Sequence, residues 1–381
     1  MILDDFHNIK DSYLLETIED FIKYCGDNVH FVLLSREELP IYFGDLIMAD
    51  RLLEINEEEL KFSDEESKAF IKNTLKSNLE DVFISKINKL SEGWVGGLQL
   101  ITLSNNKESI SKINIVNKYM IDYLSKEILD GLTEVERDFL IKTSVLSYFN
   151  EDICNKLLNI SNSREIIDTL LEKNLFLISI DEEKGIYRYH NIFSEFLKLQ
   201  FIKNDKKIIQ VVHFAAGEIF EGLYDLEESL NHFLAIEKYE RALKIIEKFG
   251  GNQKGWPFLS KIPIEFILEN PSLLIQKFFY LYCSGELDKC KDIYNKAAMR
   301  KDYDDMKKIL KFTLAIAENN FGDDKLLKVD LETFEQIDSF NISYISKAIL
   351  YLVISPFLSI SENYKDVNAV SYTHLTLPTK A

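Results

Sequence analysis

Residues 163–190 read SREIIDTLLEKNLFLISIDEEKGIYRYH, and they contain the most informative pattern for the fold. The pattern predicts a helix, then a strand over residues 175–180, a turn over residues 181–185 and a second strand over residues 186–190. A helix followed by a two-stranded wing is typical of a winged-helix domain. We expect this domain to cover residues 114–205.

Two predicted helix starts share a sequence pattern. Ser63 is followed by Glu66, and Thr133 is followed by Glu136, each pair before an apolar helical pattern. Ser or Thr with Glu three residues later allows a capping box, in which each side chain accepts a hydrogen bond from the backbone N–H of the other residue. We therefore predict helices that begin directly after Ser63 and Thr133.

The chain begins with an α/β pattern. MILDDF (residues 1–6) predicts a strand, DSYLLETIEDFIKYCGD (11–27) a helix and HFVLLS (30–35) a second strand. Two apolar strands joined by a helix predict a parallel βαβ unit, in a sheet that is covered on both faces.

The rest of this α/β region, which we expect to end near residue 105, has one more strand pattern and two helical ones. LLEIN (residues 52–56) predicts a short strand. Residues 79–104 predict a helix, a glycine-rich break over Gly93–Gly97 and another helix. The fold class predicted for the whole chain is α/β followed by mainly α.

Residues 206–369 have an all-helical pattern. Residues 215–249 and 271–299 each predict a pair of antiparallel helices. Successive helix pairs of about 34 residues are typical of a solenoid similar to tetratricopeptide repeats (TPR-like). The last twelve residues, VSYTHLTLPTKA (370–381), break this pattern and back-translate to a string that resembles a sequencing adapter. We interpret them as an adapter artefact and exclude them from the fold.

The composition restricts the class of protein. The net charge of −18 makes the 381 residues as a whole a poor surface for nucleic acid, which is bound through Lys and Arg. No apolar run reaches the roughly 18–20 residues that span a bilayer, so we expect no membrane association. The four cysteines form neither a dense disulfide framework nor a zinc pattern, which favours reduced thiols in the cytoplasm.

Five segments, in this order, resemble one family, the MalT-type LuxR-family transcriptional regulators, which are signal-transduction ATPases with numerous domains (STAND). The segments are ILDDFH (2–7), VLLSREELP (32–40), EGWVGGLQL (92–100), LTEVERDFLIKTSVL (132–146) and NLFLISIDEEKGIYRYHNIFSEFL (174–197). The resemblance implies that residues 1–105 are the C-terminal half of a P-loop NTPase (NB-ARC-like) domain with its helical lid. A winged-helix domain over residues 114–205 and a sensor solenoid over residues 206–369 would follow.

By this resemblance, Asp4 and Asp5 are the catalytic acids. Asp4 is implied to be the Walker B residue that organises Mg²⁺ through water, and Asp5 the residue that positions the attacking water. Magnesium prefers oxygen ligands and keeps several waters, so the residue types suit these roles. The alternative interpretation is that two aspartates simply end a strand at a turn or helix cap.

The resemblance also implies four nucleotide contacts. Arg36, with Ser35 beside it, would sense the γ-phosphate of ATP, and a guanidinium suits a phosphate. Arg36 has an alternative role in a surface ion pair with a neighbouring glutamate. His190 would contact the β-phosphate of ADP and hold a closed resting state, with help from Arg188. A lone histidine is more often a packed, hydrogen-bonded residue.

The segment GWVGGLQL departs from the pattern of related ATPases. Those proteins have a glycine–hydrophobic–proline segment near the adenine, whereas this chain has Gln99 where a proline would stand. The segment therefore lacks the proline that the resemblance would place near the adenine. We interpret Trp94 as a core residue rather than a stacking platform.

Two motifs of the family are absent from the sequence. No G-x-x-x-x-G-K-[ST] phosphate loop (Walker A) and no C-terminal LuxR-type helix-turn-helix is found in the 381 residues. We therefore expect an internal fragment that hydrolyses little or no ATP, from a parent that is a slow regulatory ATPase.

The function implied for the parent is a nucleotide-gated switch. ADP would favour a closed state, and ATP with a small-molecule or protein inducer on the solenoid would favour self-association and transcription activation. DNA would be bound only through the missing domain. One alternative is a non-enzymatic helical-repeat scaffold that binds another protein. Another is a STAND ATPase with a different output domain, such as a kinase.

Overall fold

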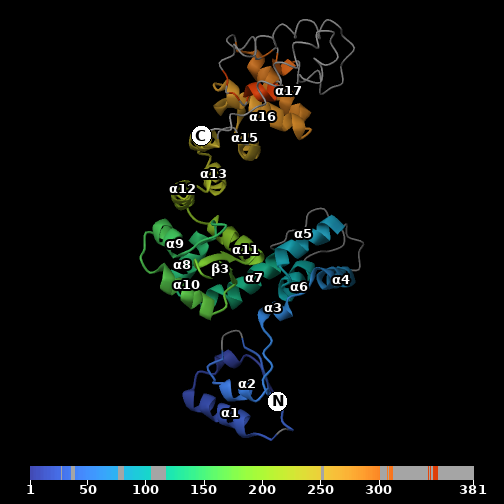
Figure 1. The fold of residues 1–381 in the computed structure, drawn as a ribbon, viewed down its shortest axis with the longest axis vertical. Helices are drawn as coiled ribbons and strands as arrows, with labels where there is room; N and C mark the ends of the chain where they lie inside the picture. The colour runs from blue at the N-terminus through green and yellow to red at the C-terminus, as the bar shows by residue number, and fades with distance from the viewer. Residues whose placement is uncertain are drawn as a thin grey trace, which may run out of the picture. The chain divides into compact units, whose positions relative to one another are not determined.

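The computed structural model describes most of the chain, in two compact units, Met1–Ala216 and Gly217–Ala381 (Figure 1). The described residues are 1–26, 28–35, 39–75, 81–103, 117–249, 253–300, 307, 309–311, 342, 344 and 346–350. This part of the chain is mostly helical, with two two-stranded sheets. The predicted fold class, α/β followed by mainly α, is confirmed. The predicted adapter segment 370–381 lies outside the described residues.

The predicted N-terminal βαβ unit is present. Strand β1 (Ile2–Leu3) pairs in parallel with β2 (Val32–Leu33), and helix α1 (Ser12–Tyr24) joins them. Both strands are shorter than predicted. The expectation of a sheet covered on both faces is wrong for the described residues, because Ile2 is 69% exposed and Val32 48% exposed. Two strands of two residues are too few to bury both faces of a sheet.

The strand predicted for residues 52–56 is wrong. Residues 51–56 are in neither helix nor strand, and helix α3 (Glu57–Leu60) starts directly after them. The Asn56 side chain accepts a hydrogen bond from the Glu59 N–H at 3.2 Å, and the Glu59 carboxylate accepts one from the Asn56 N–H at 3.0 Å. This reciprocal cap starts a helix at Asn56, the last residue of the strand that the apolar residues had suggested. Helix α2 (Gly44–Met48) lies just before this stretch.

Three helices follow, and the first starts as predicted. They are α4 (Asp64–Leu75), α5 (Asp81–Ser91) and α6 (Val95–Leu103). The Ser63 N–H donates to the Glu66 carboxylate at 2.9 Å, and the Glu66 N–H donates to Ser63 Oγ at 3.3 Å. The break between α5 and α6 covers residues 92–94, so the prediction that it extends to Gly97 is wrong. Gly97 lies inside α6, where Trp94 and Ile192 leave no room for a side chain: an added Cβ would lie 2.5 Å from Trp94 Cε3.

The winged-helix pattern is confirmed. Its strands β3 (Leu177–Asp181) and β4 (Ile186–Tyr189) pair antiparallel, and a bridge with Phe149 adds a third short segment beside Tyr187. The helices before and after the wing are α7 (Lys118–Glu127), α8 (Glu134–Thr143), α9 (Glu151–Leu158), α10 (Ser163–Glu172) and α11 (Asn191–Phe201).

Aromatic side chains fill the core of this domain. Phe149, Phe193 and Phe196 are each fully buried, and the Tyr189 ring lies 4.9 Å from the Phe149 ring and 5.9 Å from the Phe193 ring, between centroids. The buried Tyr189 hydroxyl is hydrogen-bonded to Thr143 Oγ1 at 2.6 Å, so the polar end of the ring is satisfied. This core fixes where β4 ends and α11 begins.

The second half is helical as predicted, but residues 215–249 contain the end of one helix and two further helices rather than a single pair. Helix α12 (Lys206–Gly222) spans the boundary between the units, and α13 (Leu226–Ala235), α14 (Tyr239–Lys248), α15 (Trp256–Lys261), α16 (Pro271–Cys283) and α17 (Leu287–Ala298) follow it. Short 3₁₀ helices lie at Phe6–Asn8, Leu129–Gly131, Gln253–Gly255 and Ile264–Phe266. The assignment of these pairs as TPR-like stays a prediction.

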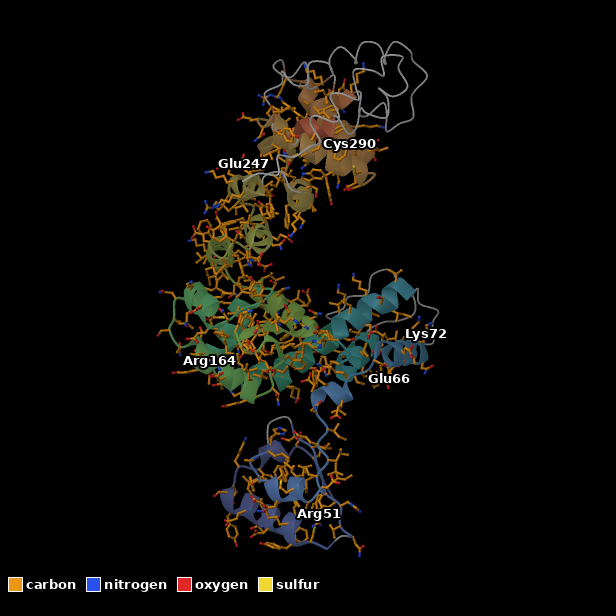
Figure 2. All side chains as sticks on the ribbon, in the orientation of Figure 1. Arg51, Glu66, Lys72, Arg164, Glu247 and Cys290 are labelled. Atoms are coloured by element: carbon orange, nitrogen blue, oxygen red, sulfur yellow. The ribbon has the colours of Figure 1, made fainter. Side chains whose placement is uncertain are left out.

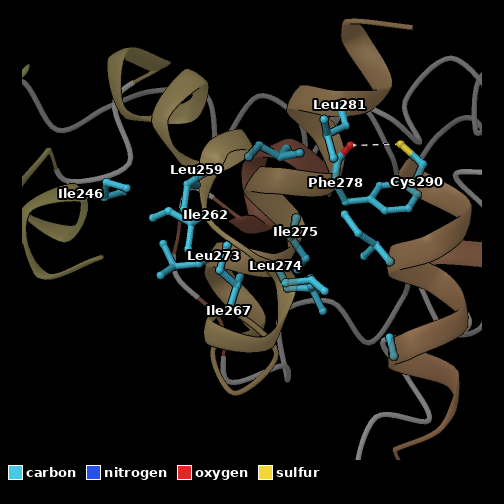
Figure 3. Close-up of a cluster of buried hydrophobic side chains, with 14 of the residues drawn as sticks. Ile246, Leu259, Ile262, Ile267, Leu273, Leu274, Ile275, Phe278, Leu281 and Cys290 are labelled. Carbon is cyan, nitrogen blue, oxygen red and sulfur yellow. Dashed lines mark hydrogen bonds between the residues drawn. The ribbon is translucent and has the colours of Figure 1, made fainter. Parts of the chain in front are cut away.

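The second unit has an apolar core with one buried charge. Figure 3 shows Leu259, Ile262, Leu274 and Phe278 packed between the helices. The buried Lys277 ammonium donates to the carbonyl oxygens of Leu259 at 3.1 Å and Ser260 at 3.4 Å, and also to that of Ile262. Burial lowers the pKa of Lys277 to about 8. Lysine therefore caps the C-terminus of α15, where backbone carbonyls lack helical partners.

Several charged side chains of the described residues lie at the surface. Arg51, Glu66, Lys72, Arg164 and Glu247 are all exposed, whereas Cys290 is buried (Figure 2). No helix in the described part of the chain is both long and apolar enough to cross a membrane.

The Thr133 capping box gives a stability prediction. The Thr133 N–H donates to the Glu136 carboxylate at 2.8 Å, and the Glu136 N–H donates to Thr133 Oγ1 at 3.3 Å. Thr133→Ala removes the acceptor for that N–H, and we expect the free energy of unfolding to fall by about 1 kcal/mol in urea titrations. Thr169→Ala is the control, because the Thr169 hydroxyl only bonds to Glu165 within its own helix. An equal effect of the two substitutions would contradict the role of the cap.

Candidate functional site

Asp4 and Ser35 lie at the same edge of the N-terminal sheet. Each follows the carboxyl end of its strand, and the pairing extends past the strands: the Leu34 N–H donates to Leu3 O and the Phe6 N–H to Leu34 O, both at 2.9 Å. Parallel strands end at a common edge, so this placement follows from the parallel pairing of β1 and β2. Arg36, the predicted γ-phosphate sensor, lies outside the described residues.

The two aspartates have different backbone conformations. Asp5 has φ 51° and ψ 41°, in the left-handed region, and its N–H donates to Asp4 Oδ1 at 2.9 Å. A left-handed residue other than glycine costs roughly 1–2 kcal/mol, which Asp tolerates better than most residues. Asp4 and Asp5 are exposed, whereas the next residue, Phe6, is buried. The structure therefore anchors the strand end through Phe6 and leaves both carboxylates at the surface.

These carboxylates suit a magnesium ion that keeps most of its water. Both are hard oxygen donors on consecutive residues, and Mg²⁺ is commonly bound through one or two carboxylates with water in the other positions. Among the described residues, no group of three or more His, Cys, Asp or Glu side chains is arranged to hold a metal ion. The donor set therefore fits a Mg²⁺ that is coordinated mostly by water and not one that is coordinated entirely by protein side chains.

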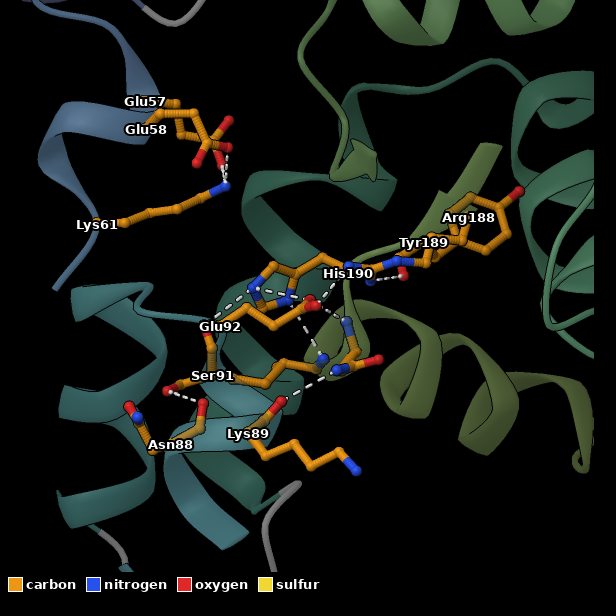
Figure 4. A network of polar contacts seen from close by, with 12 residues as sticks. Glu57, Glu58, Lys61, Asn88, Lys89, Ser91, Glu92, Arg188, Tyr189 and His190 are labelled. Atoms are coloured by element: carbon orange, nitrogen blue, oxygen red, sulfur yellow. Dashed lines mark hydrogen bonds and ion pairs between the residues drawn. The ribbon is translucent and has the colours of Figure 1, made fainter. Parts of the chain in front are cut away.

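His190 and Arg188 lie in a second place, where the winged helix contacts the turn after α5 (Figure 4). His190 is 2% exposed and caps α11, because its Nδ1 accepts a hydrogen bond from the Ile192 N–H at 3.3 Å. Its Nε2 lies 3.0 Å from the carbonyl oxygen of Ser91. A carbonyl can only accept, so the ring is neutral with its proton on Nε2.

The pKa of His190 follows from this environment. Burial lowers it below the usual value of 6.5, against the opposing effects of the Glu92 carboxylate and the Ser91 carbonyl. Protonation would place an N–H on Nδ1, facing the N–H of Ile192, so the cap would also be lost. The imidazole is therefore held neutral at pH 7.

Glu92 is the central residue of this contact. Its Oε1 accepts a hydrogen bond from Arg188 Nη2 at 2.6 Å, and its Oε2 accepts one from the Asn191 N–H at 2.9 Å. The same Oε2 lies 3.6 Å from His190 Nε2. Burial alone would raise the pKa of Glu92, but the hydrogen bonds from Arg188 and from the Asn191 N–H, together with the positive charge of Arg188, lower it on balance. Glu92 is therefore an ionised carboxylate at the N-terminus of α11, where a negative charge is favoured.

We call this cluster the lid–wing contact and define it as Ser91, Glu92, Arg188, His190 and Asn191. Three further contacts join it to neighbouring residues. The Arg188 Nη1 group donates to Tyr189 O at 3.3 Å, and the Asn191 side-chain amide donates to Lys89 O at 3.1 Å. The Trp94 ring lies edge-on to the His190 ring, with 6.0 Å between centroids. Trp94 is half-buried and packs against this contact, so the prediction that it is a core residue is met only in part.

The backbone of the turn directs Glu92 into the contact. Glu92 has φ 47° and Gly93 has φ 78°, so two consecutive residues are left-handed. The Phe62 N–H donates to Gly93 O at 2.9 Å, and a Cβ on Gly93 would lie 2.6 Å from Phe62 O. Both the backbone angle and the available space therefore require glycine.

The structure does not bring the two sets of predicted site residues together. Among the described residues, no hydrogen bond or ion pair joins Asp4 or Asp5 to Arg188 or His190. The roles predicted for these residues, and for Ser35 and Arg36, stay predictions. Sequence analysis missed Glu92, Ser91 and Asn191. The available signal was a glutamate directly before the glycine of the predicted break, at a helix end.

Comparisons with known proteins agree with the resemblance seen in the sequence. Residues 125–207 match the family model of the MalT winged helix domain. The chain is 27% identical over 259 residues to the HTH-type transcriptional regulator MalT of Vibrio campbellii, which covers 66% of the chain and 28% of that protein. It is 28% identical over 289 residues to MalT of Klebsiella pneumoniae, which covers 72% of the chain and 32% of that protein.

A solved structure is also similar. It is a STAND protein with a tetratricopeptide repeat sensor from Pyrococcus horikoshii, with a TM-score of 0.41 and 17% identity over 98% of this chain and 55% of that one. A likeness at this level carries no argument about function. The chain thus contains a MalT-type winged-helix domain and is a relative of MalT regulators, of whose length it spans about a third or less.

Gly93→Ala tests the backbone of the turn. We expect the free energy of unfolding to fall by about 1–3 kcal/mol, because alanine must adopt a left-handed φ and its Cβ meets Phe62 O. Gly131→Ala is the matched control, since no atom lies within 4 Å of its added Cβ. Urea titration of both variants measures the difference. A Gly93→Ala protein as stable as the Gly131→Ala protein would show that the turn relaxes without cost.

His190→Asn tests the neutral imidazole. The folded pKa of His190 is lowered, so its contribution to stability is fully present above pH 6.5 and is lost as the pH falls toward the folded pKa. We expect the native protein to lose more unfolding free energy between pH 7 and pH 5 than His190→Asn does. Asparagine keeps the helix cap but does not titrate. His213, whose pKa burial also lowers, is present in both proteins and cancels. Parallel pH profiles would contradict the assignment.

Proposed function

We propose that this chain is part of an ATP-dependent transcriptional regulator of the LuxR family that resembles MalT. The observation that carries the proposal is the match of residues 125–207 to the MalT winged helix domain, supported by 26–28% identity to MalT regulators over about two thirds of the chain. Because the chain spans at most about a third of those relatives, the activity of the whole protein is part of the proposal.

In this proposal, the N-terminal sheet edge is half of a nucleotide site. Asp4 organises Mg²⁺ through water and Asp5 positions the attacking water, while Ser35 and Arg36 contact the γ-phosphate. The common edge of Asp4 and Ser35 supports this arrangement, because ligands of open α/β sheets bind at the carboxyl ends of the strands. Bound Mg²⁺ would neutralise phosphate charge and hold the water network at this edge.

The winged helix supplies the second half of the proposed switch. Arg188 and His190 contact the β-phosphate of ADP and favour a closed state, whereas ATP together with an inducer on the solenoid favours self-association and transcription activation. A ligand shifts such an equilibrium only by its difference in affinity for the two states. In the proposal, Arg188 and His190 of the winged helix report which nucleotide is bound at the sheet edge.

The DNA-binding part of the proposed regulator lies elsewhere. A net charge of −18 makes these 381 residues a poor DNA surface. We therefore assign DNA binding to a further domain of the regulator, and assign to this chain the nucleotide and inducer responses.

A second candidate function is a non-enzymatic scaffold. It is favoured by one observation: both ring nitrogens of His190 are already hydrogen-bonded within the protein, as in a structural histidine. The helix pairs α13–α14 and α16–α17 would then serve to bind another protein. A STAND ATPase with another output domain is a third candidate, and it shares the nucleotide site of the first.

Asp4→Ala in the full-length regulator tests the proposal. We expect ATP turnover to fall by roughly 10- to 100-fold, as for the loss of a residue that orients a metal's water shell. Asp20→Ala is the matched control, because Asp20 is an exposed aspartate on α1, away from the strand ends. Steady-state phosphate release measures both. Unchanged turnover in Asp4→Ala would remove Asp4 from the site, and absence of turnover in the native protein would favour the scaffold.

A further inference from the structure

We propose that Glu92 is an internal latch, whose carboxylate occupies the position that a nucleotide phosphate needs in order to contact Arg188 and His190. This inference rests on the proposed function and adds a means of regulating the same site. It makes the lid–wing contact an autoinhibitory one, in which protein carboxylate and nucleotide phosphate exclude each other.

The first argument is the number of donors. In the lid–wing contact, Glu92 accepts from Arg188 Nη2 at 2.6 Å and from the Asn191 N–H at 2.9 Å, and lies 3.6 Å from His190 Nε2. A guanidinium, an imidazole and the first N–H of a helix are donors that also bind phosphate oxygens. Glu92 therefore accepts from two of the donors that the proposed phosphate contact requires, and its carboxylate lies beside the third, His190.

The second argument is the state of His190. Its Nε2 proton is donated to Ser91 O at 3.0 Å, and its Nδ1 accepts from the Ile192 N–H. Neither nitrogen has a proton left for a phosphate oxygen. Contact between His190 and a phosphate therefore requires that Nε2 leave the carbonyl oxygen of Ser91, the residue before Glu92. In the proposed latch, this hydrogen bond and those from Arg188 and Asn191 to Glu92 break together.

The third argument is the backbone of the latch. Glu92 has a left-handed φ of 47° and its side chain is 18% exposed. A glutamate in this conformation costs roughly 1–2 kcal/mol, and burying its carboxylate costs more unless the charge is paired. The contacts with Arg188 and Asn191 offset these costs in the latched state. Releasing Glu92 lets the turn relax, which lowers the cost of opening.

An alternative is that Glu92 only holds the fold together. Glu136 offers a direct comparison, because its carboxylate also lies at a helix N-terminus, accepts a backbone N–H from Thr133 and pairs with Lys173 at 2.6 Å. The pKa of Glu136 is likewise lowered by these partners against burial. The two glutamates thus have similar structural roles, but only Glu92 contacts Arg188 and His190.

The experiment measures ADP affinity of the full-length regulator with Mg²⁺ by isothermal titration. We expect Glu92→Gln to bind ADP at least about 5-fold more tightly than the native protein, as for a typical coupling between sites. Arg188→Gln breaks the same ion pair but removes a proposed phosphate donor, so it should bind ADP more weakly. Glu136→Gln should leave the affinity unchanged.

The opposite signs separate a latch from a loosened fold, which would change the ADP affinity of Glu92→Gln and Arg188→Gln in the same direction. Unchanged or weaker ADP binding by Glu92→Gln, with normal binding by the native protein, would overturn the latch and leave the proposed function in place. No ADP binding by the native protein would overturn both.

Discussion

The turn after α5 is the constraint on which the best-defined contact of the first unit depends. Two consecutive left-handed residues, Glu92 and Gly93, reverse the chain in a space too small for a Cβ at position 93. This reversal presents the Ser91 carbonyl and the Glu92 carboxylate to the same partner, the N-terminus of α11. One acceptor is neutral and the other charged, and they engage His190 and Arg188 respectively. The polar contact between the winged helix and the end of α5 therefore depends on a two-residue turn.

Local features of the fold were predictable from the sequence. The capping boxes at Ser63 and Thr133 form between residues three apart, so the sequence contains both partners of each bond. The wing was predictable for a similar reason, because a short turn fixes which residues of β3 and β4 face each other. The strand predicted over residues 52–56 failed through the same local chemistry. Asn56 and Glu59 form a helix cap, which was overlooked because the apolar residues before them suggested a strand.

Contacts between distant residues were not predictable in this way. Glu92 and Arg188 are 96 residues apart, and Ser91 and His190 are 99 apart. Nothing in a single sequence pairs them, because any of the exposed arginines could have paired with this glutamate. The resemblance to a family pointed to His190 and Arg188 but not to their partners. The edge shared by Asp4 and Ser35 was predictable because parallel strands end together, whereas the left-handed backbone of Asp5 was not.

The proposed replacement of the Glu92 carboxylate by a nucleotide phosphate has a consequence for how the nucleotide switch would respond. In the proposed latch, Arg188 Nη2 and the Asn191 N–H donate to Glu92 and the His190 proton is donated to Ser91, so a phosphate that replaces Glu92 gains only the difference between its contacts and those of Glu92. Apparent affinity for the nucleotide is then reduced by the fraction of molecules in which the latch is open. In the proposed switch, a difference that is small compared with the energy of either contact alone would let a modest bias from elsewhere in the protein decide which anion is bound. An inducer on the helical second unit would need to supply only that bias, and not the whole energy of opening.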